Sequence, residues 1–191
     1  MKARLFMSYQ NVAIPEELGH RLQQVFHLSR LPHALYDLAA FKEADLGPFT
    51  EGVATGLIST TPTRHQVRIG GETFYTHCVI DAFILPALRA QPAEIDSSDP
   101  ETHEEVGVRV TSEGFVEGGT APAEATVSFG VIREGVGSVY TVACPFINIF
   151  ASRDNYEKWA QAHPEALTLA IPLDDAVALA RVWAGAGNKC C

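Results

Sequence analysis

The chain has 191 residues, and 47% of them are hydrophobic, enough to bury a sizeable core within one domain. Its formal net charge is −9, and no basic stretch is interleaved with aromatic residues, which argues against binding to nucleic acid. No segment approaches transmembrane length, and the first residues lack the apolar run of a signal peptide. We therefore expect a cytoplasmic protein that binds neither nucleic acid nor membranes.

The first part of the chain predicts helices. Residues 15–27 place Leu18 and Leu22 on one apolar face, with Pro15 in the first helical turn. Residues 31–41 and 44–57 predict two further helices. We expect these segments to form a short N-terminal helical lobe over residues 1–63.

From residue 66 the apolar residues alternate, which is typical of strands. Gly70 and Gly71 suit the positive φ angles of a tight turn and predict a hairpin. Residues 78–89 predict a helix with Thr76 as its N-cap and with Pro86 limiting or kinking it.

The second half of the chain predicts mainly strands. A polar connection over residues 91–105 precedes alternating segments near 106–110, 115–116, 125–131, 138–144 and 146–150. Ser152 is expected to cap a helix, and a strand at 167–171 leads to a helix at 174–183. The order predicts an α+β fold in which an antiparallel or mixed β-sheet core is flanked by helices. Residues 64–184 form the main domain, followed by a flexible tail over 185–191.

The cysteines are few and unevenly placed. Cys78 and Cys144 lie inside the chain, whereas Cys190 and Cys191 form its end. A secreted disulfide scaffold would use more cysteines, and a structural zinc site would show clustered ligands. The internal pair therefore indicates reactive or metal-binding thiols in a reducing compartment. Asp81 follows Cys78 by one helical turn and shares its face.

Residue chemistry alone leaves simpler interpretations open. Cys78 is equally consistent with a small hydrophobic residue on an apolar helix. Asp81 is costly to bury unless it is paired or functional, but it fits a solvent-facing position or a hydrogen bond to the helix start. Cys144, taken alone at a strand end, is consistent with a structural role. A helix N-terminus would favour the Cys78 thiolate.

Two segments resemble the organomercurial (alkylmercury) lyase family. Residues 74–88, FYTHCVIDAFILPAL, are similar to the family's active-site segment, with its tyrosine, cysteine, aspartate and Pro-Ala-Leu end. Residues 144–152, CPFINIFAS, followed by Trp159, are similar to its second catalytic segment. The resemblance covers roughly residues 67–183. The family's better-known members begin with a longer winged-helix-like domain, and some carry a cysteine where this chain has Pro145.

The resemblance implies an alkylmercury-lyase-like catalytic domain over residues 64–184. Cys78, Asp81 and Cys144 are then its catalytic residues and its mercury ligands, with mercury bound as substrate and product. Two thiolates bind the soft metal, and the attached carbon is protonated through Asp81 without any cofactor. The alternative is a non-catalytic mercury or copper-binding protein or chaperone on the same fold.

The expected partners are an organomercurial substrate and an acceptor for Hg(II), either a thiol or a mercuric reductase. The tail pair, Cys190 and Cys191, suits transfer of a soft ion by ligand exchange, although a tail without any role is equally consistent with its composition.

Overall fold

The computed structural model describes residues 12–40 and 56–185. Its helices are α1 (Glu16–Val25), α2 (Leu35–Ala40), α5 (Val79–Arg89), α6 (Val139–Val142), α7 (Arg153–Ala162) and α8 (Leu173–Trp183), with a 3-10 turn η2 (Cys144–Phe146). Its strands are β1 (Ile58–Ser59), β2 (His65–Ile69), β3 (Glu72–Thr76), β4 (Ala93–Ser98), β5 (Glu105–Val110), β6 (Val116–Gly119), β7 (Thr126–Ile132), β8 (Ile149–Phe150) and β9 (Ala166–Pro172). No described helix is both long and apolar enough to cross a membrane.

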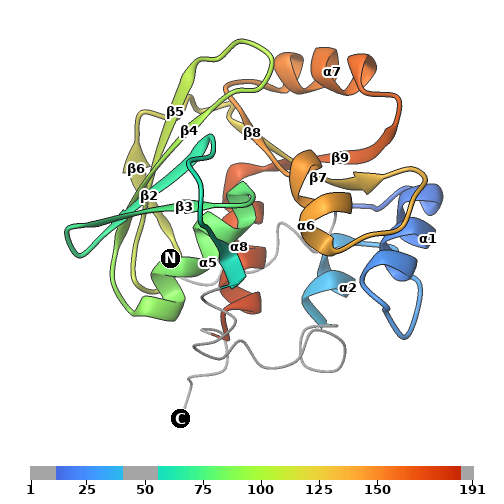
Figure 1. Cartoon of the computed structure of the whole chain (residues 1–191), viewed down its shortest axis with the longest axis horizontal. Coiled ribbons are helices and arrows are strands. Elements are labelled where there is room, and N and C mark those ends of the chain that lie inside the picture. The colour runs from blue at the N-terminus through green and yellow to red at the C-terminus, as the bar shows by residue number, and fades with distance from the viewer. Residues whose placement is uncertain (1–11, 41–55, 186–191) are drawn as a thin grey trace.

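The strands form two separate antiparallel sheets (Figure 1). One has six strands in the order β1-β3-β2-β4-β5-β6, and the other has three in the order β8-β7-β9. Strands β2 and β3 form the predicted hairpin, with Gly70 at φ 60° and Gly71 at φ 86° in the turn. These are left-handed angles that glycine adopts without a steric penalty. The α+β expectation is confirmed, with every strand of the described residues pairing antiparallel.

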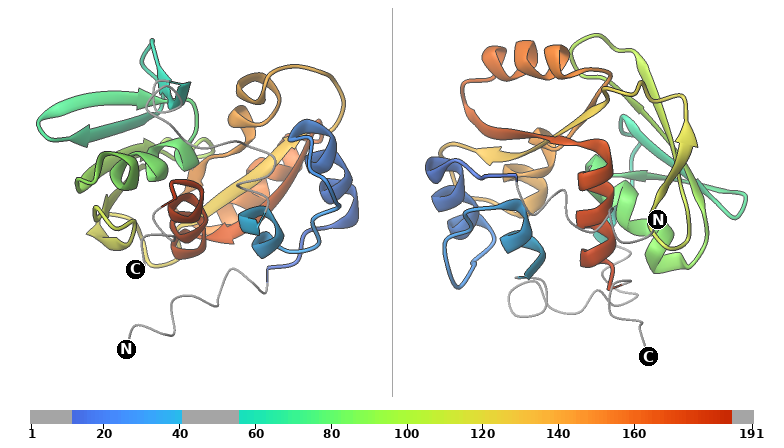
Figure 2. Two further views of the ribbon diagram at one scale, coloured as in Figure 1. Left: turned by 90° about the horizontal axis from the view of Figure 1, so that it is seen from below. Right: turned by 180° about the vertical axis from the view of Figure 1, so that it is seen from behind.

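Helices α5 and α8 fill the space between the two sheets (Figure 2). Helix α5 packs on β2, β3 and β4, α8 packs on β7 and β9, and the two helices contact each other. Apolar residues of both helices therefore belong to the core, including the fully buried Phe83 and Leu179. Any side chain at the start of α5 lies deep inside the molecule.

The N-terminal helices pack against this same core. Helix α1 contacts β7 and β9, α2 contacts α8, and Leu18, Leu22 and Leu35 join the main hydrophobic cluster. Strand β1 pairs with β3 across the expected boundary at residue 63. The division at that residue stays a prediction. Of the helix expected over 44–57, residues 44–55 lie outside the described part of the chain.

Two sequence predictions of strands and connections were wrong. The segment 138–144, expected as a strand, forms the short helix α6 and the start of η2. The polar connection expected over 91–105 contains β4, whose Ala93, Ile95 and Ser97 are buried in alternation. Strand β4 pairs with β2 and β5 at the centre of the larger sheet.

Candidate active site

The start of α5 presents Cys78 and Asp81 to the interior. Cys78 is the N-cap, with extended backbone angles of φ −146° and ψ 172°, and Asp81 is the third residue of the helix. An N-cap and a third helical residue lie on the same side of the first turn, which brings the two side chains together. Thr76, expected as the N-cap, instead donates its hydroxyl hydrogen to the carbonyl oxygen of Cys78 at 2.9 Å.

Cys144 lies in an irregular segment rather than at a strand end. It opens η2, which Ala143 separates from α6, and side chains hold the following backbone in place. Asn148 donates its amide to the carbonyl of Pro145 at 2.9 Å. Ser128 of β7 donates its hydroxyl to the carbonyl of Phe146 at 2.8 Å and accepts from the backbone amide of Asn148 at 2.9 Å. These buried bonds replace the regular pairing that a strand would supply.

The two cysteine-bearing segments are joined by one backbone hydrogen bond. The amide of Val79, the first residue of α5, donates to the carbonyl of Ile147 at 3.3 Å. That amide is among those that a helix leaves without an internal partner. The start of α5 is thus anchored to the segment that carries Cys144.

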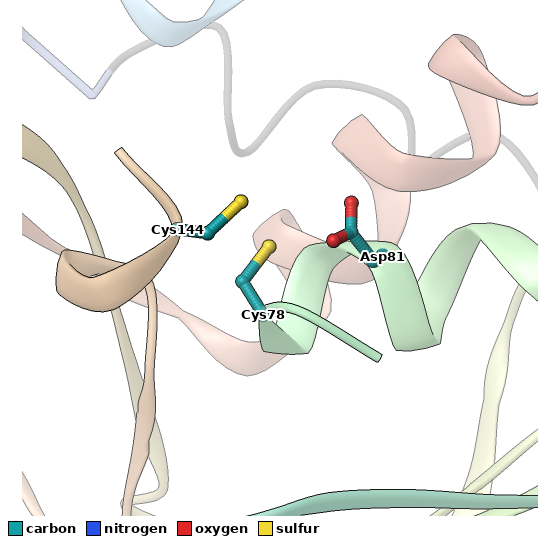
Figure 3. Close-up of side chains that lie close together, drawn as sticks. All are labelled: Cys78, Asp81 and Cys144. Carbon is teal, nitrogen blue, oxygen red and sulfur yellow. The ribbon is translucent and has the colours of Figure 1, made fainter. Parts of the chain in front are cut away.

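The three predicted residues meet in one buried cluster (Figure 3). The two sulfurs and a carboxylate oxygen of Asp81 all lie within 4.8 Å of one another. Cys78 is 2% exposed, Cys144 4% and Asp81 8%. Neither described cysteine is in a disulfide, so both sulfurs are free to bind one ion. Two thiols and a carboxyl around one point form a donor set that suits a soft metal.

Burial sets the protonation of Asp81. Removal from water raises the pKa of its carboxyl from an ordinary 3.8 to about 7, against the opposite effect of its contacts with the thiol and backbone of Cys78. Within the described residues, Oδ2 of Asp81 is buried and has no hydrogen-bond partner. An unpaired buried carboxylate oxygen is costly, so the site favours the protonated acid.

The thiol of Cys78 is also held in its protonated form. Burial raises its pKa well above the ordinary value, and the hydrogen bond with Cys144 and the charge of Asp81 act in the same direction. The expected lowering at a helix start is therefore wrong. Loss of water outweighs the helix dipole at a residue this deeply buried.

A buried histidine of the six-stranded sheet contacts the segment that follows Cys144. His65 on β2 lies 3.0 Å from the Ser97 hydroxyl through Nδ1. Its pKa is lowered to about 3, mainly by burial and also by the charge of Arg64, against the opposite effect of a hydrogen bond with Asn148. His65 is thus neutral and contacts the residue that holds the Pro145 carbonyl. Its role is to position the backbone rather than to exchange protons.

The sequence indicated the three site residues but not Ser128 and Asn148, which hold the Cys144 segment in place. Ser128 was part of an apolar run, and a single serine within that run was the available signal. Asn148 lies within the segment 146–150 that was expected to be a strand, and it is 4% exposed. The tail cysteines, Cys190 and Cys191, lie outside the described residues.

Known proteins are similar to this chain in sequence. Residues 58–185 match the family model described as alkylmercury lyase. An alkylmercury lyase of Streptomyces lividans is 33% identical over 124 residues, which are 65% of this chain and 55% of that protein. One of Pseudomonas putida is 27% identical over 135 residues, or 70% and 61% of the two chains. The chain thus spans a little over half of these relatives.

A solved structure shares the fold. It is described as the crystal structure of the mercury-bound form of MerB2, and it superimposes with a TM-score of 0.56 at 23% identity. The match covers 68% of this chain and 61% of that one.

Proposed function

This chain belongs to the alkylmercury lyase family, and we propose that it cleaves the carbon–mercury bond of organomercurials by protonating the carbon. Cys78, Asp81 and Cys144 carry the reaction. The products are a hydrocarbon and Hg(II) held by two sulfurs. The single observation that carries the proposal is the buried carboxyl of Asp81, within 4.8 Å of both thiols and with one oxygen lacking a partner among the described residues.

The first steps are ligand exchanges at mercury. A thiol of the site displaces the ligand that accompanies the R–Hg group, its proton leaves with that ligand, and a sulfur–mercury bond forms. The second sulfur then bonds to the same mercury and releases its proton to Asp81 in those molecules in which the carboxyl is ionised, since a pKa of about 7 leaves both forms populated at neutral pH. Mercury is soft and prefers thiolates to oxygen ligands, so both exchanges are favourable.

The last step breaks the carbon–mercury bond. Two thiolates donate electron density to mercury, which makes the attached carbon more basic. The protonated Asp81 delivers its proton to that carbon, the bonding electrons go to the new carbon–hydrogen bond, and R–H leaves. Mercury stays in the Hg(II) oxidation state, so no oxidant, reductant or organic cofactor is required.

The direct test is product release. Protein incubated with methylmercury or phenylmercury and excess small thiol is expected to release methane or benzene, measured by gas chromatography. Cys78→Ser and Cys144→Ser are each expected to reduce release by at least about 100-fold, because serine oxygen binds mercury poorly. Folded wild-type protein that releases neither hydrocarbon would disprove the proposal.

Substitution of Asp81 distinguishes an enzyme from a protein that only binds the metal. Asp81→Asn keeps the shape of the side chain but removes the acid, so mercury should still bind while turnover falls by about 100-fold or more. Binding is measured by competition with dithiothreitol. If wild-type protein binds mercury tightly and releases no hydrocarbon, the alternative of a non-catalytic mercury or copper-binding protein takes its place.

The bound Hg(II) has to leave by another ligand exchange. We propose that its acceptors are a small thiol or a mercuric reductase, with the tail pair as an intermediate carrier. Cys190→Ser with Cys191→Ser is then expected to slow transfer to an added dithiol without changing hydrocarbon release. Equal transfer rates for this variant and the wild type would remove the tail from the pathway.

A further inference from the structure

One aromatic contact connects the two segments that carry the site cysteines. The rings of His77 and Tyr140 have centroids 4.5 Å apart and an interplanar angle of 44°. His77 directly precedes Cys78, and Tyr140 lies on α6, one helical turn before Cys144. The contact therefore lies across the junction at which the two thiols meet.

The pair is accessible to solvent, whereas the thiols are not. Tyr140 is 45% exposed and His77 is half-buried, in contrast to the buried cysteines of the same two segments. An exposed tyrosine ring is unusual beside a buried polar cluster, because aromatic rings are usually buried in the core. Solvent thus reaches the Tyr140 ring directly, whereas it does not reach the thiols.

The phenol end of Tyr140 is also positioned. A Cβ atom placed on Gly56 would lie 2.8 Å from the Tyr140 hydroxyl oxygen, so the absent side chain of Gly56 leaves room for the phenol. Partial burial raises the pKa of Tyr140, and the charges of Asp81, Cys144 and Cys78 raise it further. The charges of all three site residues therefore act on the phenol, and the contact with His77 places the Tyr140 ring beside the segment that carries Cys78.

We propose that Tyr140, packed on His77, forms an aromatic rim above the thiol site and that the organic group of the substrate rests against the Tyr140 ring. This inference rests on the proposed function. Tyr140 touches the part of the substrate that does not react, so it acts as a specificity residue. A planar aryl group can stack on the ring, whereas a methyl group is too small to cover it. Tyr140 therefore favours arylmercury over methylmercury.

The predicted signature is a change in the ratio of two rates. An aromatic pair contributes enough free energy to change a rate about 2- to 10-fold. Tyr140→Ala should lower the preference for phenylmercury over methylmercury by this factor, mainly through phenylmercury. Tyr140→Phe keeps the ring and should keep the preference. A matched control is Phe115→Ala, which removes a partly exposed aromatic ring from the turn between β5 and β6, at the opposite edge of the larger sheet from β3.

The experiment has two readouts that fail separately. The first is capture: stopped-flow absorbance follows sulfur–mercury bond formation with phenylmercury and methylmercury under single-turnover conditions, and it needs no cleavage. The second is kcat/KM for benzene and methane release. Absence of release with intact capture contradicts the proposed function, whereas the capture ratio still tests the role of Tyr140.

The inference would be overturned if Tyr140→Ala left the ratio of the capture rates for phenylmercury and methylmercury unchanged. An equal fall in both capture rates would give that result. A Tyr140→Phe variant that loses as much preference as Tyr140→Ala would also overturn it, since the hydroxyl and not the ring would then be responsible. If Tyr140→Ala fails to fold, Gly56→Ala supplies the test. The added methyl group displaces the phenol, and a ratio equal to that of the wild type counts against the rim.

Discussion

The two halves of the thiol site are built by different means, although each supplies one buried sulfur. Cys78 and Asp81 belong to the start of α5, an 11-residue helix whose residues from Val79 to Pro86 are buried. Cys144 belongs to a short turn whose backbone is held by the side chains of Ser128 and Asn148. The helical half depends on apolar packing between the sheets. The turn half depends on a few buried hydrogen bonds, so the two should respond differently to substitution.

The largest expected effect is on packing in the helical half. Phe83 is 0% exposed in α5, and Phe83→Ala should lower the free energy of unfolding by about 3–5 kcal/mol. The matched variant is Phe146→Ala in η2, where the shorter segment can relax into the space, so the loss should be smaller by about 1–2 kcal/mol. Urea denaturation measures both. Equal losses would contradict the comparison.

The next effect is the pH dependence contributed by Asp81 in the metal-free protein. Its folded-state pKa of about 7 exceeds the ordinary 3.8, so between these values the folded protein keeps a proton that the unfolded chain has released. This contribution to stability is therefore present at low pH and is lost as pH rises toward 7. From about pH 5 to about pH 8, Asp81→Asn should gain on the order of 3 kcal/mol relative to wild type.

Denaturation of both proteins across this range measures that gain. The difference between the two proteins cancels the titration of other groups. Superimposable pH profiles would show that the carboxyl is not buried in the way described.

A substitution in the turn half should lower the stability less, but it should weaken the retention of mercury more. Ser128→Ala removes the donor to Phe146 and the acceptor for the Asn148 amide, which should cost about 1–3 kcal/mol. Because these bonds hold the turn that carries Cys144, mercury should also be lost more readily to dithiothreitol. A variant that is destabilised but competes as well as wild type would show that the turn is held by other contacts.

The smallest effect serves as the control for that variant. Ser152 caps α7, a helix that carries none of the three site residues, and its hydroxyl oxygen accepts a hydrogen bond from the amide of Asn155 at 3.2 Å. Ser152→Ala should cost about 1 kcal/mol by thermal denaturation and leave mercury competition unchanged. A change in competition here would mean that any loss of stability disturbs the site, and the contrast with Ser128→Ala would lose its meaning.

The helical half of the site was predictable from sequence because its geometry depends on residues that are close together in the chain. Helical spacing alone places Asp81 on the same side as Cys78, and the apolar residues around them indicate burial. The resemblance of residues 144–152 to the lyase family indicated Cys144, but the local structure of the turn half was not predictable. Val139, Tyr140 and Val142 are strand-forming residues, yet they form a helical turn, because tertiary contacts override such preferences.

Strand β4 shows a second limit. Glu94 and Asp96 gave its sequence a polar character typical of a connection. In the folded protein these carboxylates pair across the sheet with Arg68, and Glu94 also pairs with Arg109. The pairing partners lie on other strands, so a local pattern does not contain them. The fold class was predictable because enough other segments alternate clearly.

The hydrogen bond from the Val79 amide to the Ile147 carbonyl has a consequence for how the protein is made. Cys78 and Cys144 are remote in sequence, and contacts between remote segments require closure of a long loop. A chain still emerging from the ribosome has Cys78 before Cys144 exists, and so offers mercury a single thiol. The chelating pair arises only when both sheets have assembled around α5. Under the proposed function, tight capture of the metal is thereby reserved for molecules that have finished folding.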